Sequence, residues 1–179
     1  MVLSTATFAG GCFWCIEAAF SSLNGVKSAT SGYTGGTTGL TNYDEVCTGK
    51  TGHAEAVQIV FDAQIISYET LLIMFFSLHD ATQLNRQGDD IGTQYRSAIF
   101  YGDEQQKIQA EALIAKLSRE EVYQETIKTE VNKLETFYPA EEHHQGYYLK
   151  NPEQGYCNMV ITPKFMKFKA KYQAQFKKS

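Results

Sequence analysis

The chain has 179 residues, of which 43% are hydrophobic and 20% are charged, and its formal net charge is −4. These values are typical of a soluble globular domain. The negative net charge argues against binding to a polyanion, so we expect no nucleic-acid partner. No apolar stretch approaches the ~18 residues that span a membrane, and the N-terminus lacks the basic start and apolar core of a signal peptide. We therefore expect one domain over residues 1–179, in a cytoplasmic protein with no membrane partner.

Hydrophobic periodicity predicts the elements of the first half of the chain. Alternation of apolar and polar residues predicts strands over residues 4–9, 26–33 and 55–61. Apolar helices are predicted over residues 13–22 and 68–78, and Ser67 suits the N-cap of the second helix. Residues 34–53, which are rich in glycine and threonine, predict a long loop.

The second half continues in the same way. A polar loop is predicted over 79–94, and it leads to strands over 96–101 and 126–131. Between these strands, Asp103 suits the cap of a helix that ends near residue 118. Lysines and aromatic residues then interleave over 164–178. Because a charged run is usually a solvated face, we interpret this tail as an amphipathic helix packed on the domain, rather than as a surface for RNA or membranes.

Two β-α-β halves of this kind predict an α+β fold, a two-layer sandwich in which helices pack on a mixed β-sheet. Loops over 34–53, 79–94 and 135–160 are long for a compact domain, and such loops often carry function. They are rich in Tyr, His, Asp, Glu and Gln. We therefore expect the polar residues of a functional site on these loops.

Cys12 is the first candidate for chemistry, because residues 10–15 read Gly-Gly-Cys-Phe-Trp-Cys between a predicted strand and a predicted helix. Free N–H groups and the helix dipole at this position favour a thiolate. The two glycines let the backbone approach a ligand closely. We interpret Cys12 as a nucleophile with Phe13 and Trp14 forming an apolar pocket, and the alternative is a small buried residue of the first helical turn.

Three other cysteines offer partner thiols. Four cysteines in a chain without a signal peptide point to catalytic, redox-active or buried thiols rather than to structural disulfides. Cys15 completes a Cys-x-x-Cys pattern, so it is either a redox partner of Cys12 or a core residue. Cys157, in a polar loop, could also move to meet Cys12. Cys47 lies in the glycine-rich loop, and we interpret it as a spectator.

Acidic residues supply candidate proton donors. Glu55 stands at the start of an apolar strand, where partial burial would raise the pKa of its carboxyl and suit it to general acid catalysis. Its alternative interpretation is an exposed strand residue. Asp89, Asp90, Tyr95 and Arg96 cluster before the next strand, where a structural ion pair is the alternative to a functional role.

A metal site is not predicted. Glu141 and Glu142 precede His143 and His144, but adjacent histidines do not share a helix face. No second pair of ligands stands at a metal-like spacing.

Taken together, these residues resemble the A-type peptide methionine sulfoxide reductases over nearly the whole chain. The family's motifs occur in order as Gly-Cys-Phe-Trp at 11–14, Gly-His-Ala-Glu at 52–55, Gly-Thr-Gln-Tyr-Arg-Ser at 92–97, and the segment from Asn151-Pro152 to Gly155-Tyr156-Cys157. The resemblance implies the family's α+β sandwich of ferredoxin-like type. It also implies a substrate, the S-epimer of methionine sulfoxide, either free or in proteins.

The resemblance assigns roles residue by residue. Cys12 matches the nucleophile, which would emerge as a sulfenic acid. Phe13 and Trp14 match the aromatic pair that holds the methyl group of the substrate. Glu55 matches the acid that gives a proton to the sulfoxide oxygen.

Loop residues match the supporting groups of the family. Tyr43 and Tyr95 match two phenols that hydrogen-bond to the sulfoxide oxygen. Asp90, although Asp89 is adjacent, matches a carboxylate that orients the substrate. His144 matches a histidine near the site with a supporting role.

The same resemblance makes Cys157 the resolving cysteine. Many members have Gly where this chain has Cys15, so Cys15 stays an alternative resolving thiol. Thioredoxin, or dithiothreitol in vitro, would reduce the resulting disulfide, and no metal or organic cofactor would be required. We expect a monomer. From the residues alone, a general thiol–disulfide oxidoreductase and a non-enzymatic binding module also remain open.

Overall fold

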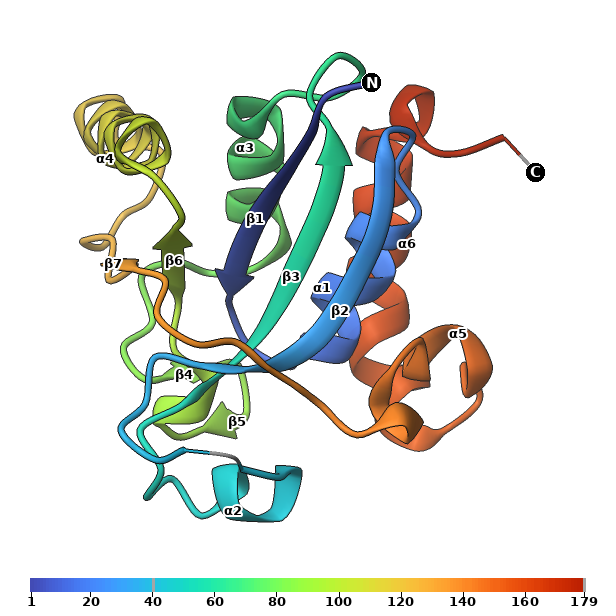
Figure 1. Cartoon of the computed structure of the whole chain (residues 1–179). Coiled ribbons are helices and arrows are strands. Elements are labelled where there is room, and N and C mark those ends of the chain that lie inside the picture. The colour runs from blue at the N-terminus through green and yellow to red at the C-terminus, as the bar shows by residue number, and fades with distance from the viewer. Residues whose placement is uncertain (40, 179) are drawn as a thin grey trace.

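A six-stranded sheet forms the centre of the fold in the computed structural model, which describes residues 1–39 and 41–178 (Figure 1). Leu40, within the predicted loop 34–53, and Ser179, the end of the predicted domain, lie outside the described residues. The strands are β1 (Leu3–Ala9), β2 (Val26–Thr34), β3 (Ala54–Asp62), β6 (Ala98–Tyr101), β7 (Glu130–Lys133) and β8 (Tyr138–Pro139). Their order is β7-β6-β1-β3-β2-β8. Because β6 and β7 are parallel while the other neighbours are antiparallel, the sheet is mixed, as predicted.

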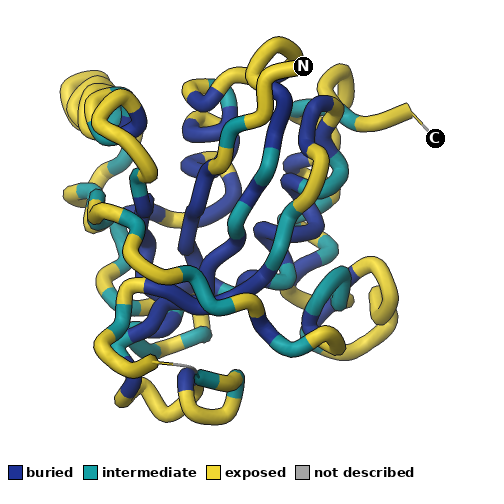
Figure 2. Tube along the Cα trace, viewed as in Figure 1, coloured by how far each residue is buried: buried dark blue, intermediate teal, exposed yellow. Residues whose placement is uncertain are grey.

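Helices form the second layer. They are α1 (Phe13–Ser21), α3 (Tyr68–Leu78), α4 (Glu104–Arg119) and α6 (Thr162–Lys171). Figure 1 shows α1, α3 and α6 behind the sheet, with α4 beside β6. Buried residues lie between the two layers (Figure 2). Phe8 of β1 is at the centre of this core, because its ring centroid lies 4.9 Å from that of Phe75 and 5.7 Å from that of Phe20. The structure therefore confirms the predicted α+β sandwich.

Side-chain caps fix the helix starts that the sequence predicted. The Ser67 side chain accepts a 3.1 Å hydrogen bond from the Thr70 amide at the start of α3. Asp103 does the same for the Gln106 amide, at 2.9 Å, at the start of α4. The predicted bounds of α3 are confirmed without change. α1, β1 and β2 differ from prediction by one residue at one end, and β3 differs by one residue at each end.

Short elements interrupt the three predicted loops. They are α2 (Tyr43–Cys47), β4 (Arg86–Gln87), β5 (Asp90–Ile91), η1 (Thr93–Tyr95), η2 (Glu142–His144), α5 (Tyr147–Lys150) and η3 (Cys157–Ile161). Hydrophobic periodicity does not detect segments this short. Local side-chain bonds define them instead, as where Asn42 Oδ1 accepts a 2.9 Å hydrogen bond from the Glu45 amide to begin α2. The prediction that Cys157 lies in a loop is wrong, since it begins η3.

The strand predicted over 126–131 is displaced to 130–133. Its first residues are held elsewhere, because the Lys128 amide donates to Ala81 O at 2.7 Å and Thr129 Oγ1 lies 2.8 Å from Ser97 Oγ. Pairing with β6 begins only at Glu130. Similarly, β6 begins at Ala98 rather than at residue 96.

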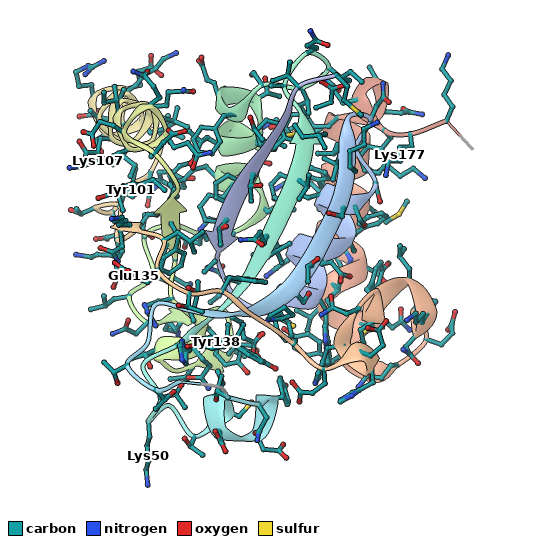
Figure 3. The ribbon with its side chains drawn as sticks, in the orientation of Figure 1. Lys50, Tyr101, Lys107, Glu135, Tyr138 and Lys177 are labelled. Atoms are coloured by element: carbon teal, nitrogen blue, oxygen red, sulfur yellow. The ribbon has the colours of Figure 1, made fainter. Side chains whose placement is uncertain are left out.

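The C-terminal tail packs on the domain as predicted. Phe168 of α6 is buried, with its ring centroid 6.3 Å from that of Phe20. The Lys177 ammonium donates to Ser21 O at 2.9 Å. Figure 3 shows Lys177 beyond α6, and Lys107 beside Tyr101, whose ring centroid lies 5.8 Å from the ammonium. Within the described residues, no helix has the length and apolarity needed to cross a membrane.

A buried histidine joins α3 to the strands. His79 Nδ1 lies 2.9 Å from Phe75 O, and its Nε2 lies 2.7 Å from Ser97 Oγ. Burial lowers the pKa of His79 from 6.5 to about 4. At a pH between these two pKa values, His79 binds a proton in the unfolded chain but not in the folded chain. The stability that neutral His79 provides is therefore complete above about pH 6.5 and is lost as the pH falls toward 4.

We expect acidification from pH 7 to pH 4 to lower the free energy of unfolding by up to about 3 kcal/mol through this residue. Urea unfolding across this pH range measures the loss. In His79→Gln the pH slope should flatten, whereas His143→Gln, which removes an exposed histidine, should retain the wild-type slope. Equal slopes in all three proteins would contradict the assignment.

Candidate active site

Cys12 occupies the N-cap of α1, at the point where β1 ends. Gly11 turns the chain there with φ of +87°, and a Cβ at Gly11 would lie 2.9 Å from Gln87 Cγ, so both conformation and space require glycine. The Gly11 amide donates to Tyr95 O at 3.2 Å. Figure 1 shows α2, the β4–β5 hairpin and α5 gathered at this end of β1. The predicted loops therefore meet around the predicted nucleophile.

The thiol of Cys12 is partly exposed, and its pKa is raised. Burial raises the pKa of Cys12 well above its ordinary value, and the charge of Glu55 raises it further, while the Trp14 amide lowers it. The direction of this shift is opposite to the expectation that the helix end favours a thiolate. The helix N-terminus does act in the predicted direction, but desolvation of a sulfur anion costs more.

Glu55, the second residue of β3, lies against the first turn of α1. Its Oε1 accepts a 3.1 Å hydrogen bond from the Phe13 amide, and its Oε2 is buried with no partner among the described residues. Burial raises the pKa of Glu55 to about 8, partly offset by the Phe13 amide. The predicted raised pKa is confirmed, so the carboxyl keeps its proton at neutral pH, and Oε2 can carry that proton.

Two phenols lie near this carboxyl. Tyr43 comes from α2 and Tyr95 from η1. Burial raises the pKa of both, and the charge of Glu55 is the next largest cause for each. Both phenols therefore stay protonated and can donate hydrogen bonds beside the Glu55 carboxyl.

Asp90 of β5 contacts a residue that the sequence did not single out. The Tyr156 hydroxyl donates to an Asp90 carboxylate oxygen, whereas Asp89 is exposed. Burial, and then the charge of Cys12, raise the pKa of Tyr156, so its phenol also lies near the thiol. The position of Tyr156 directly before Cys157 was the only sequence signal for this contact.

Phe13 and Trp14 form an aromatic wall beside Cys12. Phe13 is fully buried, and Trp14 is half-buried. The Trp14 indole stacks on Tyr147, with ring centroids 3.9 Å apart and an interplanar angle of 14°. Its Nε1 donates a 3.1 Å hydrogen bond to His144 Nδ1. The structure thus brings His144 to the wall, and it adds Tyr147, which the sequence analysis missed.

The four cysteines are free thiols in the structure. Cys15 and Cys157 belong to one apolar cluster, which also contains Tyr148 and Ile161. Burial raises the pKa of Cys15 to about 11 and also raises that of Cys157. Cys47 is exposed at the end of α2.

Arg96 has the structural role that was its alternative interpretation. Its Nε lies 3.3 Å from a Glu130 oxygen, and its Nη1 donates to Thr93 O at 2.9 Å. Arg96 therefore ties η1, and Tyr95 with it, to β7.

Three potential metal ligands lie closer together than the sequence suggested. Donor atoms of Glu141, His143 and His144 lie within 4.8 Å of one another, because η2 turns the adjacent histidines together. Two of these side chains are already used. Glu141 accepts hydrogen bonds from the Tyr33 hydroxyl at 3.1 Å and the Tyr43 amide at 3.2 Å, and His144 Nδ1 accepts one from Trp14. A metal-bound histidine donates a hydrogen bond from the ring nitrogen that does not bind the metal, whereas His144 Nδ1 accepts one. These three side chains therefore do not suit a metal.

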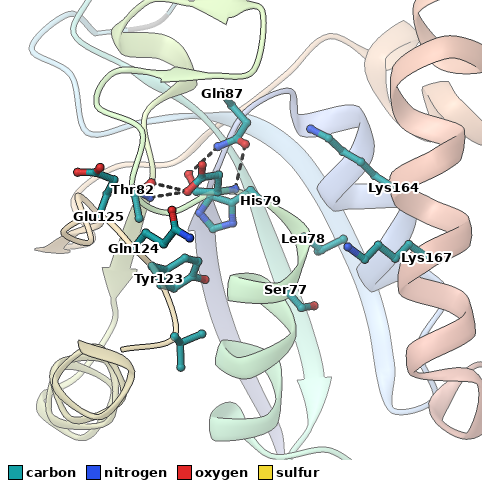
Figure 4. A pocket seen from close by; sticks show the side chains of 12 residues that line it. Ser77, Leu78, His79, Thr82, Gln87, Tyr123, Gln124, Glu125, Lys164 and Lys167 are labelled. Atoms are coloured by element: carbon teal, nitrogen blue, oxygen red, sulfur yellow. Dashed lines mark hydrogen bonds between the residues drawn. The ribbon is translucent and has the colours of Figure 1, made fainter. Parts of the chain in front are cut away.

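A cavity of about 560 Å³ lies apart from these groups, between α6 and the segments that follow α3 and α4. Figure 4 shows Lys164 and Lys167 on α6, across the cavity from His79. One of its lining residues is Gln87, whose side chain a Cβ at Gly11 would meet. The cavity contains neither a cysteine nor Glu55, so it is not the candidate site.

The fold and the thiol site are those of an oxidoreductase that acts on sulfur. The peptide methionine sulfoxide reductase family matches residues 4–177. A peptide methionine sulfoxide reductase MsrA of Pasteurella multocida is 56% identical over 172 residues, which cover 96% of this chain and 98% of the relative. This chain therefore belongs to the peptide methionine sulfoxide reductase family.

Solved structures agree with this assignment. The reduced form of Mxr1 from Saccharomyces cerevisiae matches with a TM-score of 0.80 and 32% identity, covering 87% of this chain and 89% of that one. Mxr1 in complex with Trx2 matches with a TM-score of 0.57 and 23% identity, covering 81% and 84%, which shows likeness of fold alone.

Proposed function

We propose that this protein reduces the S-epimer of methionine sulfoxide, free or in proteins, with Cys12 as the nucleophile. The observation that carries the proposal is the buried Glu55 carboxyl, which is protonated at neutral pH and has one oxygen without a partner. A sulfoxide sulfur is electrophilic, but its oxygen leaves only when it gains a proton. Thiol–disulfide exchange needs no such acid, so Glu55 favours sulfoxide reduction over that rival.

In the proposed reaction, Cys12 sulfur attacks the substrate sulfur while Glu55 gives its proton to the sulfoxide oxygen. The oxygen then passes to Cys12 as two bonds break, the sulfur–oxygen bond of the substrate and the new bond between the two sulfurs. This yields methionine and a sulfenic acid, and the proton that the thiol lost on attack restores Glu55. Tyr43 and Tyr95 donate hydrogen bonds to the oxygen as charge develops on it. Each well-placed donor of this kind is worth about 3 kcal/mol in the transition state.

The aromatic wall accounts for the proposed choice of epimer. The partly exposed Trp14, with the buried Phe13 beside it in the chain, offers an apolar surface for the methyl group, while Glu55 and the phenols receive the oxygen. Asp90 orients the rest of the substrate. Only one arrangement of methyl, oxygen and chain around a chiral sulfur satisfies all three contacts, and a separate enzyme serves the other epimer.

The sulfenic acid is then resolved by a second thiol. In our proposal Cys157 attacks Cys12 sulfur, which forms a disulfide and releases the oxygen as water, and Cys15 is the alternative thiol. Thioredoxin reduces the disulfide, as the complex of Mxr1 with Trx2 suggests for a protein of the same fold. No metal or organic cofactor enters these steps.

Replacement of the nucleophile should abolish the reaction. We expect Cys12→Ser to show no reduction of a peptide methionine S-sulfoxide, because the alcohol is a far weaker nucleophile toward sulfur. Methionine formation followed by chromatography measures this, with an insulin-reduction assay run in parallel. Full turnover by Cys12→Ser, or strong insulin reduction without sulfoxide reduction in the wild type, would contradict the proposal.

Removal of the acid should slow the first step. We expect Glu55→Ala and Glu55→Gln to lower the single-turnover rate by about 10²–10⁴-fold, the usual contribution of a general acid. The glutamine retains an acceptor for the Phe13 amide but has no acidic proton. A wild-type rate in Glu55→Gln would therefore exclude the acid role, even if Glu55→Ala were slow.

Peptide mapping after one turnover identifies the resolving thiol. We expect a Cys12–Cys157 disulfide in the wild type and unimpaired thioredoxin-dependent turnover in Cys15→Ser. Cys157→Ser should instead release one methionine per chain and then stop. A Cys12–Cys15 disulfide, with turnover maintained in Cys157→Ser, would give the role to Cys15.

A further inference from the structure

Three short loop segments lie around the candidate site. They are residues 43–50, which contain α2, residues 86–91, which form the β4–β5 hairpin, and residues 141–150, which contain η2 and α5. Figure 1 shows α2, the hairpin and α5 at the same end of the sheet. The first and third segments are in direct contact, because a Glu141 carboxylate oxygen accepts a 3.2 Å hydrogen bond from the Tyr43 amide. Side chains of all three segments therefore border one site.

These segments are acidic. Together they contain six carboxylates and three cations, which leaves a net charge of −3 with neutral histidines, against −4 for the whole chain. We call the six carboxylates the acidic rim: Asp44, Glu45, Asp89, Asp90, Glu141 and Glu142. Asp90 and Glu141 are half-buried, and the other four are exposed. Most of the net negative charge of the chain is thus gathered around the site.

No described cation forms an ion pair with the acidic rim. Within the part of the chain that the structure describes, the one ion pair within 4.0 Å joins two residues outside the rim. Lys150 Nζ donates to a backbone carbonyl at 2.9 Å, and the Arg86 guanidinium donates to another at 2.6 Å. Figure 3 shows Lys50 extending away from the fold. The negative charge of the rim therefore remains available to a partner.

Positive charge is concentrated in the C-terminal segment. Residues 162–178 contain six lysines and no acidic residue. One of these lysines, Lys177, donates to Ser21 O at 2.9 Å, at the end of α1 that lies away from Cys12. Figure 3 shows Lys177 far from Lys50. The two ends of the molecule thus differ in the sign of their charge, which draws a cationic partner toward the acidic rim.

The acidic rim borders a buried group that has a free oxygen. Glu55 is 1% exposed, and its Oε2 has no hydrogen-bond partner among the described residues. Burial raises the pKa of Glu55 to about 8, and the charge of Asp90 adds to the rise, so the rim acts on this carboxyl. In the proposed reaction, Oε2 carries the proton for the sulfoxide. Because neighbouring residues of a peptide are about 4 Å apart, those beside the bound sulfoxide come to lie against the rim.

We propose that the acidic rim selects polypeptide substrates in which lysine or arginine flanks the methionine sulfoxide. The inference rests on the proposed function and names the class of substrate that the site prefers. A cationic flank is attracted by the rim, whereas an acidic flank meets charges of its own sign. The flanking residues take no part in the bonds that form and break. Their charge therefore changes KM rather than kcat.

Three peptides of equal length test the inference. Each contains one methionine S-sulfoxide, flanked on both sides by two lysines, by two glutamines or by two glutamates. At about 20 mM ionic strength, we expect kcat/KM for the lysine peptide to exceed that for the glutamate peptide by about 10-fold, with the glutamine peptide between them. In about 0.5 M salt the ratio should fall to about twofold, because the charges are then screened over a few ångströms.

Two triple variants with the same change in net charge locate the effect. The rim variant combines three substitutions: Asp44→Asn, Asp89→Asn and Glu142→Gln. The control variant combines three substitutions of exposed carboxylates along α4 and at its end: Glu104→Gln, Glu111→Gln and Glu120→Gln. We expect the rim variant to lower the preference for the lysine peptide to about threefold or less, and the control variant to retain it. Both should reduce methyl p-tolyl sulfoxide, a neutral small substrate, at the wild-type rate, which also shows that they fold.

Equal kcat/KM for the lysine and glutamate peptides at low ionic strength would overturn the inference. So would a control variant that loses as much of the preference as the rim variant, since net charge alone would then explain it. A wild-type protein that reduces neither the peptides nor methyl p-tolyl sulfoxide would instead overturn the proposed function. In that case the fluorescence anisotropy of labelled peptides would still measure whether the rim binds the lysine peptide more tightly than the glutamate peptide.

Discussion

The hydrogen bond from the Phe13 amide to Glu55 is the contact on which the site depends. The first amides of a helix lack partners within the helix, and here a side chain of the central sheet supplies one. The contact joins the start of α1 to β3 and holds the carboxyl in a buried position. Burial then keeps Glu55 protonated at neutral pH, so no carboxylate charge lies beside the thiol of Cys12. One contact therefore sets both the geometry and the charge of the site.

The sheet and the loops contribute different groups to the site. β1, α1 and β3 position the groups nearest the proposed chemistry, while the loops deliver phenols, carboxylate and imidazole to them. Each loop is held by hydrogen bonds next to its functional residue, in two cases to a strand or helix of the frame and in one case to a neighbouring loop. The Glu141 carboxylate accepts a hydrogen bond from the Tyr43 amide, and the Glu17 carboxylate accepts one from the Gly146 amide. The Arg96 guanidinium donates to Thr93 O in the turn that precedes Arg96. Because these hydrogen bonds take the place of regular backbone pairing, the irregular segments hold their functional side chains in defined positions.

Patterns of periodicity and capping predicted the frame well, and local composition predicted the loops poorly. Ser67 and Asp103 predicted the starts of α3 and α4, because an N-cap is a local interaction. Thr129 shows the limit, because its bond to Ser97 is invisible in sequence and it displaced the predicted strand. The pKa of Glu55 followed from its place at the start of an apolar strand. The pKa of the Cys12 thiol shifts in the direction opposite to the prediction, because the residues that desolvate the thiol come from segments distant in the chain.

The state of the thiols has a consequence for the protein's own survival. The pKa of each of the four cysteines is raised, with burial as the largest cause in each case. Peroxides attack thiolates far faster than thiols, so susceptibility to overoxidation follows thiolate content. The direction of these shifts therefore leaves fewer thiolates on the resting sulfurs for peroxides to attack.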